Sequence, residues 1–159
     1  MSNVTVRNQG IPSMSKDAVS KVREFEDWML QMPQSPVATH HIIHAGMYSR
    51  TIMIPKDTLL TGALIEIATI LIINGDAEVG IGEDTTRLTG YAVLPASQHR
   101  KQSFYTHEDT HVTMVFATDA KTVEDAEIEF TKEAVRLMSR APHSDNHVVI
   151  TGEEKCQEQ

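Results

Sequence analysis

The sequence predicts an all-β core, built as a compact antiparallel sandwich or barrel, with one helix before it and one helix after it. From Thr51 to Thr118, short runs rich in Ile, Val, Leu and Thr are interrupted roughly every 8–12 residues by turn residues, as in small all-β domains. On both sides of this stretch, apolar residues recur instead at the spacing of an amphipathic helix. A chain of 159 residues with 40% hydrophobic residues has the size and composition of one domain with an ordinary core.

The N-terminal part is expected to be a flexible arm followed by a helix. Residues 1–14 show no periodicity and are interrupted by Gly10 and Pro12. Ser15 is a suitable N-cap, because its hydroxyl can accept a hydrogen bond from an amide of the first helical turn. The residue before Pro33 disfavours helical backbone angles. We therefore predict a helix over residues 15–33.

The central part, residues 37–118, is predicted to hold the strands. Side chains alternate between the two faces of a strand, so Tyr48, Arg50, Ile52 and Ile54 should share one face. The stretch 59–73 is too long for one strand and is expected to bend near Glu66. The other expected strands cover residues 37–48, 47–54, 77–81, 85–89, 91–94, 99–105 and 111–117. The expected core residues, open to a shift of one residue along each strand, are Ile52, Ile54, Leu64, Ile70, Ile72, Val79, Val93, Val112 and Met114.

The C-terminal part is predicted to form a second helix and a polar tail. Thr122, with Asp125 three residues later, resembles a capping box, and an apolar stripe then continues to Met138. These features predict a helix over residues 122–140. Residues 141–159 are mostly polar and are expected to be disordered in isolation. Because short helices are unstable alone in water, we also expect at least one helix to pack across a subunit boundary.

Composition excludes several classes of function. The formal charge of −8 argues against a membrane surface and against broad nucleic-acid binding, since both need clustered Lys and Arg. The single cysteine, Cys156, rules out an internal disulfide and suits a reducing compartment. Residues 1–30 lack the features of a signal peptide. We therefore expect a protein of the cytoplasm.

Three segments of the central stretch resemble the cupins, also called RmlC-like jelly rolls. They are residues 54–58 (IPKDT), residues 73–76 (INGD) with the strand after them, and residues 90–100 (GYAVLPASQHR). Gly75 corresponds to the Gly that ends the first cupin motif, and Gly90 and Pro95 correspond to the Gly and Pro of the second, with a gap one residue shorter. The resemblance implies a cupin-like antiparallel jelly-roll barrel. Cupins commonly associate through their sheets, so it also implies a homo-oligomer.

The same resemblance implies that the usual cupin metal site is missing. Metal-binding cupins carry two His and one Glu ahead of the first-motif Gly, where this chain has Thr61, Ala63 and Ala68. The His of the second motif falls near Arg100, with His99 one place early. A shift of one residue along a strand moves a side chain to the opposite face of the sheet. The expectation is therefore a protein with no metal and no other cofactor.

The order of elements is also similar to that of small cupin-like proteins encoded by bacteriophages and prophages. This resemblance suggests a non-catalytic protein that binds a small ligand or a protein partner, for example to sequester a host nucleotide signal. An accessory structural subunit of a phage particle is an alternative. A metal-dependent enzyme with a displaced His site is another, and stoichiometric metal in protein purified without an affinity tag would favour it.

Anion recognition is the binding chemistry that the side chains suggest. Arginine suits bidentate binding of carboxylate or phosphate. Arg50 is the first candidate, since an arginine on an inward face needs a paired acid or an anionic ligand. Glu66, within the central apolar run, is the expected internal acid, while a solvated face is the alternative. The residues expected to contact a ligand are Arg50, Tyr48, Glu66, His99, Arg100, Lys101 and Tyr105.

The histidines offer a weaker hypothesis of metal binding. His99, His107 and His111 could converge if neighbouring strands bring them together, with an acid nearby. In a second group, His40 and His44 share one strand face and His41 lies on the other, so only two of these three could reach one ion. Partly exposed histidines on an edge strand are the simpler interpretation of this second group.

Overall fold

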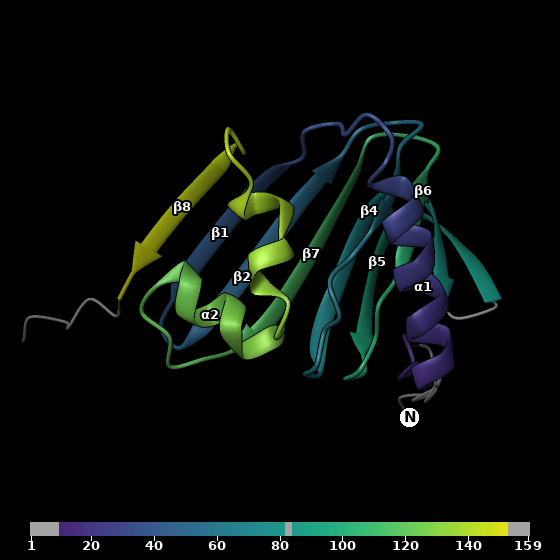
Figure 1. Ribbon diagram of the computed structural model, residues 1–159. Helices are drawn as coiled ribbons and strands as arrows, with labels where there is room; N and C mark the ends of the chain where they lie inside the picture. Colours follow the sequence, from purple (N-terminus) through teal and green to yellow (C-terminus); the bar gives the residue numbers. More distant parts are fainter. Residues whose placement is uncertain (1–9, 82–83, 153–159) are drawn as a thin grey trace, which may run out of the picture.

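The computed structural model describes residues 10–81 and 84–152 and shows a curled sheet with both helices on its concave side (Figure 1). The sheet forms a half-barrel. In chain order the elements are α1 (Lys16–Met29), β1 (Ala38–His44), β2 (Met47–Ile54), β3 (Leu59–Thr61), β4 (Thr69–Ile81), β5 (Asp84–Ala96), β6 (Ser103–Thr106), β7 (Thr110–Ala117), α2 (Val123–Phe130), two 3₁₀ turns η1 (Ala134–Arg136) and η2 (Met138–Arg140), and β8 (Asn146–Thr151).

The sheet is mixed, because a strand from outside the expected barrel of residues 37–118 adds a parallel pair to an otherwise antiparallel sheet. The strand order is β3-β6-β4-β7-β2-β1-β8, and β5 pairs with β4. All these pairs are antiparallel except β1 with β8, which run parallel. The parallel strand comes from residues 146–151, which the sequence analysis assigned to a disordered tail. This segment is a strand because tertiary pairing with β1 satisfies its backbone.

Strand β4 is the element on which the sheet curls. Residues 70–74 of β4 pair with β7, and residues 77–80 pair with β6. Gly75 lies between these two pairings, with a positive φ of 148°. A Cβ there would lie 2.4 Å from Thr110 Oγ1, so only glycine allows this close approach. The break expected between residues 73 and 77 is therefore a bend inside one long strand, and the separate strands expected at 77–81, 85–89 and 91–94 are parts of β4 and β5.

The inward faces of the strands agree with the sequence for β2 and differ for β4 and β5. Tyr48, Arg50 and Ile54 are buried on one face of β2, as alternation predicts. In the part of β4 before Gly75, the buried apolar residues are Leu71 and Ile73, while Ile70 is exposed and Ile72 is half-buried. Val93 in β5 is also exposed. Before Gly75 the buried set of β4 is therefore shifted by one residue from the expected one, which exchanges the two faces. After Gly75, Val79 is buried as expected.

Helix α1 begins as predicted and packs within the chain. Ser15 Oγ accepts a hydrogen bond from Ala18 N at 3.1 Å, which is the expected N-cap. The helix ends at Met29 rather than near Pro33. Val19 and Val22 pack against Leu64 in a small cluster with Met14. Residues 10–14 of the expected flexible arm are therefore anchored, because Met14 and Ile11 are also buried; residues 1–9 lie outside the described residues.

Helix α2 is much shorter than the predicted helix over residues 122–140. Its N-cap is confirmed, since Thr122 Oγ1 accepts a hydrogen bond from Asp125 N at 3.2 Å. The helix ends at Phe130, because Thr131 adopts extended backbone angles (φ −149°, ψ 141°). The two 3₁₀ turns that follow bring Ser139 and Arg140 back onto Glu127 of α2. Tertiary hydrogen bonds therefore override the helical pattern of the sequence after residue 130.

Both helices bury apolar residues within their own chain, α1 against Met14 and Leu64 and α2 against the sheet. Ala126 and Phe130 of α2 pack with Tyr48 and Phe116 of the sheet. Other apolar side chains of the helices remain exposed, namely Trp28 of α1 at 51% and Ile128 of α2 at 63%, so the packing of a helix across a subunit boundary stays a prediction. Within the described residues, no helix has the length and apolar character needed to cross a membrane.

Candidate functional site

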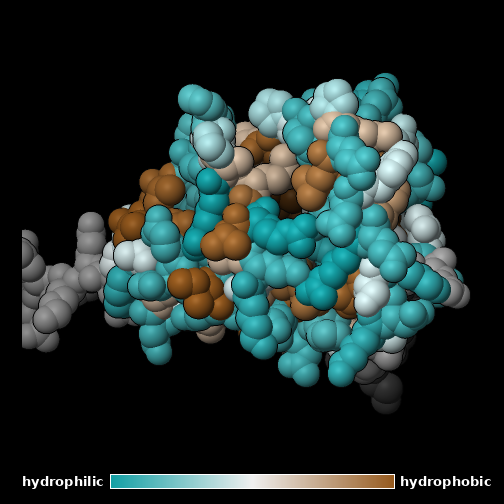
Figure 2. Space-filling model, viewed as in Figure 1, coloured by the Kyte–Doolittle hydropathy of each residue, from teal (hydrophilic) through white to brown (hydrophobic). Residues whose placement is uncertain are grey.

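A cavity of about 140 Å³ lies on the concave face of the sheet, between α1 and the turns that follow α2. Figure 2 shows this face hollowed between the two helical layers, with hydrophobic atoms deep in the hollow and hydrophilic residues beside it. The sheet provides the apolar floor, and polar side chains from β2, the segment before β6, α1 and η1 complete the walls. The main floor residues are Ile52, Leu60, Leu71, Phe104, Val112 and Met114.

Arg100 is a buried cation on the wall of this cavity. Its side chain is 1% exposed, and its two Nη atoms donate hydrogen bonds to the carbonyls of Ile67 and Ser97 and to the Thr69 hydroxyl, at 2.7–3.1 Å. Among the described residues no carboxylate forms an ion pair with it, and its Nε has no hydrogen-bond partner. Burial lowers the pKa of Arg100 to about 10, so the guanidinium remains charged at neutral pH.

Gln102 gives the same wall a second unsatisfied donor. It lies two residues after Arg100, is buried, and lines the cavity. Its Nε2 has no hydrogen-bond partner within the described part of the chain. A buried donor without a partner costs about 1–3 kcal/mol, so two on one cavity wall need an explanation.

Lys101, between these two residues, belongs to an ion-pair network that joins α1 to η1 at the rim. Its Nζ lies 2.7 Å from Glu26 of α1 and 3.7 Å from Glu133, and it donates to the carbonyl of Gly62. Arg136 of η1 also pairs with Glu26, at 3.0 Å. Burial alone would raise the pKa of Glu133. The pKa nevertheless lies below its usual range, because Arg23 and the Leu64 amide donate hydrogen bonds to the carboxylate and the charge of Lys101 also favours the ionised form.

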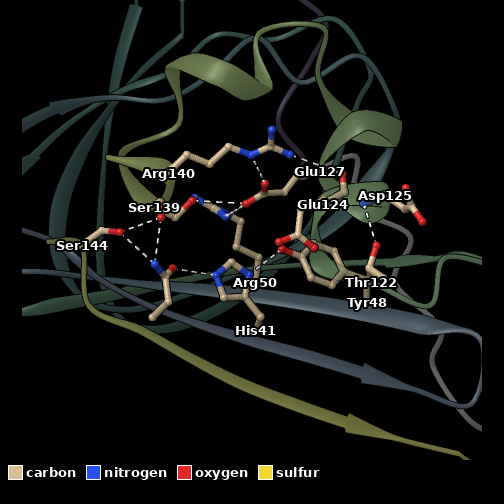
Figure 3. Close-up of polar contacts among 11 residues, drawn as sticks. His41, Tyr48, Arg50, Thr122, Glu124, Asp125, Glu127, Ser139, Arg140 and Ser144 are labelled. Carbon is tan, nitrogen blue, oxygen red and sulfur yellow. Dashed lines mark hydrogen bonds and ion pairs between the residues drawn. The ribbon is translucent and has the colours of Figure 1, made fainter. Parts of the chain in front are cut away.

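Arg50 also lines the cavity, and its acid partner is Glu127, not Glu66. Arg50 Nη1 lies 3.0 Å from Glu127 Oε1, and Arg50 Nη2 donates to Ser139 Oγ at 3.0 Å (Figure 3). Glu127 is 2% exposed and also accepts a hydrogen bond from Arg140. The expectation of an inward-facing Arg50 with a paired acid is therefore correct, but the acid comes from α2. The alternative of a solvated Arg50 is wrong.

Tyr48 does not contact the cavity, although it was an expected ligand-binding residue. It is fully buried between the rings of Phe116 and Phe130, and its hydroxyl lies 2.8 Å from His41 Nδ1 (Figure 3). Burial raises the pKa of Tyr48 to about 12, so the hydroxyl keeps its proton and can donate to His41. The other ring nitrogen of His41 lies 3.0 Å from Asn146 Oδ1 at the start of β8. Asn146 Oδ1 can only accept, so His41 carries a proton on Nε2. Burial lowers the pKa of His41 and favours the neutral ring, in which Nδ1 accepts from the Tyr48 hydroxyl.

Stability should depend on pH through His41. Burial lowers the pKa of His41 below 6.5, so the unfolded chain takes up this proton at a higher pH than the folded chain. The contribution of His41 is then complete above pH 6.5 and is lost as the pH falls from 6.5 through the folded-state pKa. We expect a smaller loss in the free energy of unfolding between pH 7.5 and pH 5 for His41→Gln than for the parent, measured by urea unfolding. Equal losses for the parent and the variant would show that protonation of His41 does not cause the pH dependence.

The structure separates the other expected site residues from the cavity. Glu66 is half-buried and pairs with Lys132 at 3.4 Å. His99 occupies a bend with a positive φ of 57°, and Tyr105 stacks edge-on against His107 away from the cavity. Neither Glu66, His99 nor Tyr105 lines the cavity.

The structure does not assemble the alternative metal site from His99, His107 and His111. His107 pairs instead with Glu78 at 3.0 Å, and His111 lies on the exposed face of β7. Within residues 10–81 and 84–152, no three His, Cys, Asp or Glu side chains are placed to hold a metal ion. His40, His41 and His44 lie on β1 as expected, with His41 buried and the other two exposed on the opposite face.

The acids and the amide of the site were not among the residues expected from the sequence. Gln102 continues the polar run Arg100–Gln102, so this run was a usable signal in an otherwise apolar region. Glu26, Glu127 and Glu133 lie in segments with many other acids, and no local pattern distinguishes them. Their roles follow from contacts with residues distant in the chain, such as Glu26 with Thr61, 35 positions away, and Glu127 with Arg50, 77 positions away.

Comparisons with known proteins give no family for the chain. No protein-family model and no curated protein matches it. Solved structures with a similar backbone include KdgF from Halomonas sp. (15% identity, 57% of this chain and 87% of that chain covered, TM-score 0.45) and the cupin domain of Schizosaccharomyces pombe Cnp3 (15%, 54% and 67%, 0.44). Ectoine synthase from P. lautus is another (16%, 62% and 76%, 0.44). Likenesses at this level carry no argument about function, which must come from the residues of the chain.

Proposed function

We propose that the protein binds a small anion with an apolar body in the cavity on the concave face of its sheet, without catalysing a reaction. In this proposal the chain is a cupin-like jelly roll whose pocket holds cationic side chains in place of a metal centre. A cytoplasmic, phage-encoded binder that sequesters a small host metabolite is the setting that the resemblance of the sequence suggests.

The observation that carries the proposal is the environment of Arg100. A buried charge is costly unless it is paired, and Arg100 has no acid partner among the described residues. Its free Nε and the free Nε2 of Gln102 are donors that await an acceptor. An anionic oxygen bound at this wall would satisfy donors and charge together, because a guanidinium binds carboxylate or phosphate through charge-assisted hydrogen bonds.

The size of the cavity limits the ligand. A cavity of about 150 Å³ lined by apolar residues holds one benzene molecule, and this cavity measures about 140 Å³. Pockets that enclose drug-sized ligands have about 300–1,000 Å³. A small aromatic or branched carboxylate therefore suits the cavity better than a nucleotide, which would extend beyond it.

The lining supports binding rather than catalysis. The described residues around the cavity include four basic side chains and two acidic ones, but no His, Cys or Ser. His, Cys and Ser are common nucleophiles and proton carriers of enzymes, as are Glu and Lys. The lining Glu26, Glu133 and Lys101 are held in ion pairs. Lys101 and Arg136 already have acid partners at the rim, which leaves Arg100 as the lining cation free to pair with an added anion.

Thermal unfolding with small probes tests the proposal. Benzoate should raise the Tm of the parent protein, and benzamide, which has the same shape without the charge, should raise it less. A ligand present at 100 times its Kd stabilises a folded protein by about 2.7 kcal/mol. Arg100→Met should abolish the benzoate effect. The stability of the empty variant is measured separately, because the change removes a buried charge without an acid partner but also removes the hydrogen bonds that Arg100 donates to Ile67 O, Ser97 O and Thr69 Oγ1.

The matched control is Arg87→Met, which removes one positive charge outside the cavity. Arg87 is exposed and pairs with Asp76 on the β4–β5 hairpin, so its loss should leave the benzoate effect unchanged. A panel of small carboxylates and phosphates extends the test to other ligands of the same charge. If no anion of the panel gives a Tm shift that depends on Arg100, the proposal is wrong.

A further inference from the structure

Strand β8 is an open edge of the sheet. Among the described strands, β1 is its one neighbour, and Figure 1 shows β8 at the outer end of the sheet with its far side uncovered. All six of its residues are exposed, and Val148, Val149 and Ile150 are each 50–55% exposed. An exposed apolar edge strand is a template for pairing with another strand.

The usual protections of a sheet edge are absent from this strand. Its sequence, NHVVIT, contains no Lys, Arg, Asp, Glu or Pro, and β8 forms six regular residue pairs with β1. Asn146 also anchors the start of the strand, since it contacts His41 and donates to the carbonyl of Ser139. The edge is therefore held as a flat, ordered strand before any partner arrives.

The backbone of β8 offers hydrogen-bonding groups in a defined pattern. Thr39 N donates to Asp145 O at 2.9 Å, so the odd-numbered residues of this segment turn their backbone groups toward β1. Backbone groups alternate in direction along a strand. Asn146, Val148 and Ile150 therefore present their N–H and C=O groups to the free edge.

We propose that β8 pairs with β8 of a second copy of this chain, antiparallel and around a two-fold axis at Val149. In this register Val148 faces Ile150 of the second copy, Val149 faces Val149, and His147 faces Thr151. Each apolar residue meets an apolar residue and no like charges oppose each other. Val148 and Ile150 both carry outward backbone groups, so they can exchange hydrogen bonds.

The other arrangements fit less well. With the axis at Val148, Ile150 would face Asn146 and Val149 would face His147, so apolar residues would oppose polar ones. Pairing of β8 with the β3 or β5 edge of another copy would be head-to-tail, and such contacts produce open filaments unless the rotation closes. The β8–β8 contact is closed by its own symmetry and extends one curled sheet into the next.

Cysteine cross-linking tests the register in the full chain, with Cys156→Ser removing the native thiol. Val149→Cys should give a disulfide-linked dimer under mild oxidation, because the Cα atoms of a central non-hydrogen-bonded pair lie about 4.5 Å apart, within disulfide range. Val148→Cys should not, because its copies are diagonal neighbours about 7–8 Å apart. Cross-linking through residue 148 and not 149 would overturn the proposed register.

Light scattering at micromolar concentration tests the dimer itself, with the parent expected at twice the mass of one chain. Val148→Pro should give a monomer, because it removes an N–H that faces the free edge and leaves the β1 ladder intact. Val148→Thr keeps this N–H and should remain a dimer. A monomeric parent, or a Val148→Pro variant that dimerises like the parent, would overturn the proposal. The Val149→Cys result stands even if the proline variant does not fold.

Discussion

Replacing Glu127 by Leu should lower the free energy of unfolding by about 3–5 kcal/mol, the usual result of removing one partner from a buried ion pair. Glu127 is 2% exposed and is the acid that holds Arg50. Without it, the Arg50 guanidinium stays in the protein interior with Ser139 Oγ and the Phe130 ring as its remaining contacts. Arg140 also loses its partner, but its side chain is more exposed and can turn to solvent. Urea unfolding at pH 7 measures the loss.

The double variant Arg50→Met with Glu127→Leu tests whether the acid partner of Arg50 is Glu127 or Glu66, the acid expected from the sequence. It should recover much of the loss, because replacing both members of a buried pair by apolar residues is often neutral or stabilising. Arg50→Met with Glu66→Leu should recover nothing beyond Arg50→Met alone. Glu66→Leu by itself should cost only about 0–1 kcal/mol, since its partner Lys132 is exposed. Recovery by Glu66→Leu, or a loss below about 0.5 kcal/mol for Glu127→Leu, would contradict the structure.

Ile73→Ala should cost about 2–5 kcal/mol, as is usual for truncating a buried Ile. Ile73 is 1% exposed and packs in the main core cluster with Leu71, Val79 and Val112. The truncation removes apolar contacts and leaves a cavity that a close-packed interior fills only in part. The same urea unfolding experiment measures the change.

Ile72→Ala is the matched control for this change, since it removes the same atoms from the next residue of the same strand. Ile72 is half-buried and faces the convex side, where it pairs with Thr113 and Val93. Its truncation should cost clearly less than that of Ile73. Equal losses would show that the two faces of β4 are wrongly assigned.

The sequence was enough to predict the arginines of the candidate site, but it did not identify the acid that pairs with Arg50. Arg50 and Arg100 were expected to contact a ligand, because arginine within an apolar stretch needs an acid or an anion, and both line the cavity. Tyr48 lies on the same strand face as Arg50, but Phe130 of α2 covers it. The alternation of side chains along one strand cannot predict that a helix covers a residue. Glu127 reaches Arg50 across 77 residues of sequence, and only the packing of α2 on the sheet creates that contact.

The sequence by itself determined the β-rich centre, the two helix N-caps at Ser15 and Thr122, and the shared face of Tyr48, Arg50 and Ile54, because each of these depends on residues a few positions apart. Only the tertiary structure decided where α2 ends, how β4 continues through the bend at Gly75, and that residues 146–151 form a strand. These three features depend on partners distant in the chain: Glu127 with Arg140, Gly75 with Thr110, and β8 with β1. Local propensity is weak compared with burial and with the need to pair every buried backbone group, so long-range contacts set the final boundaries of the elements.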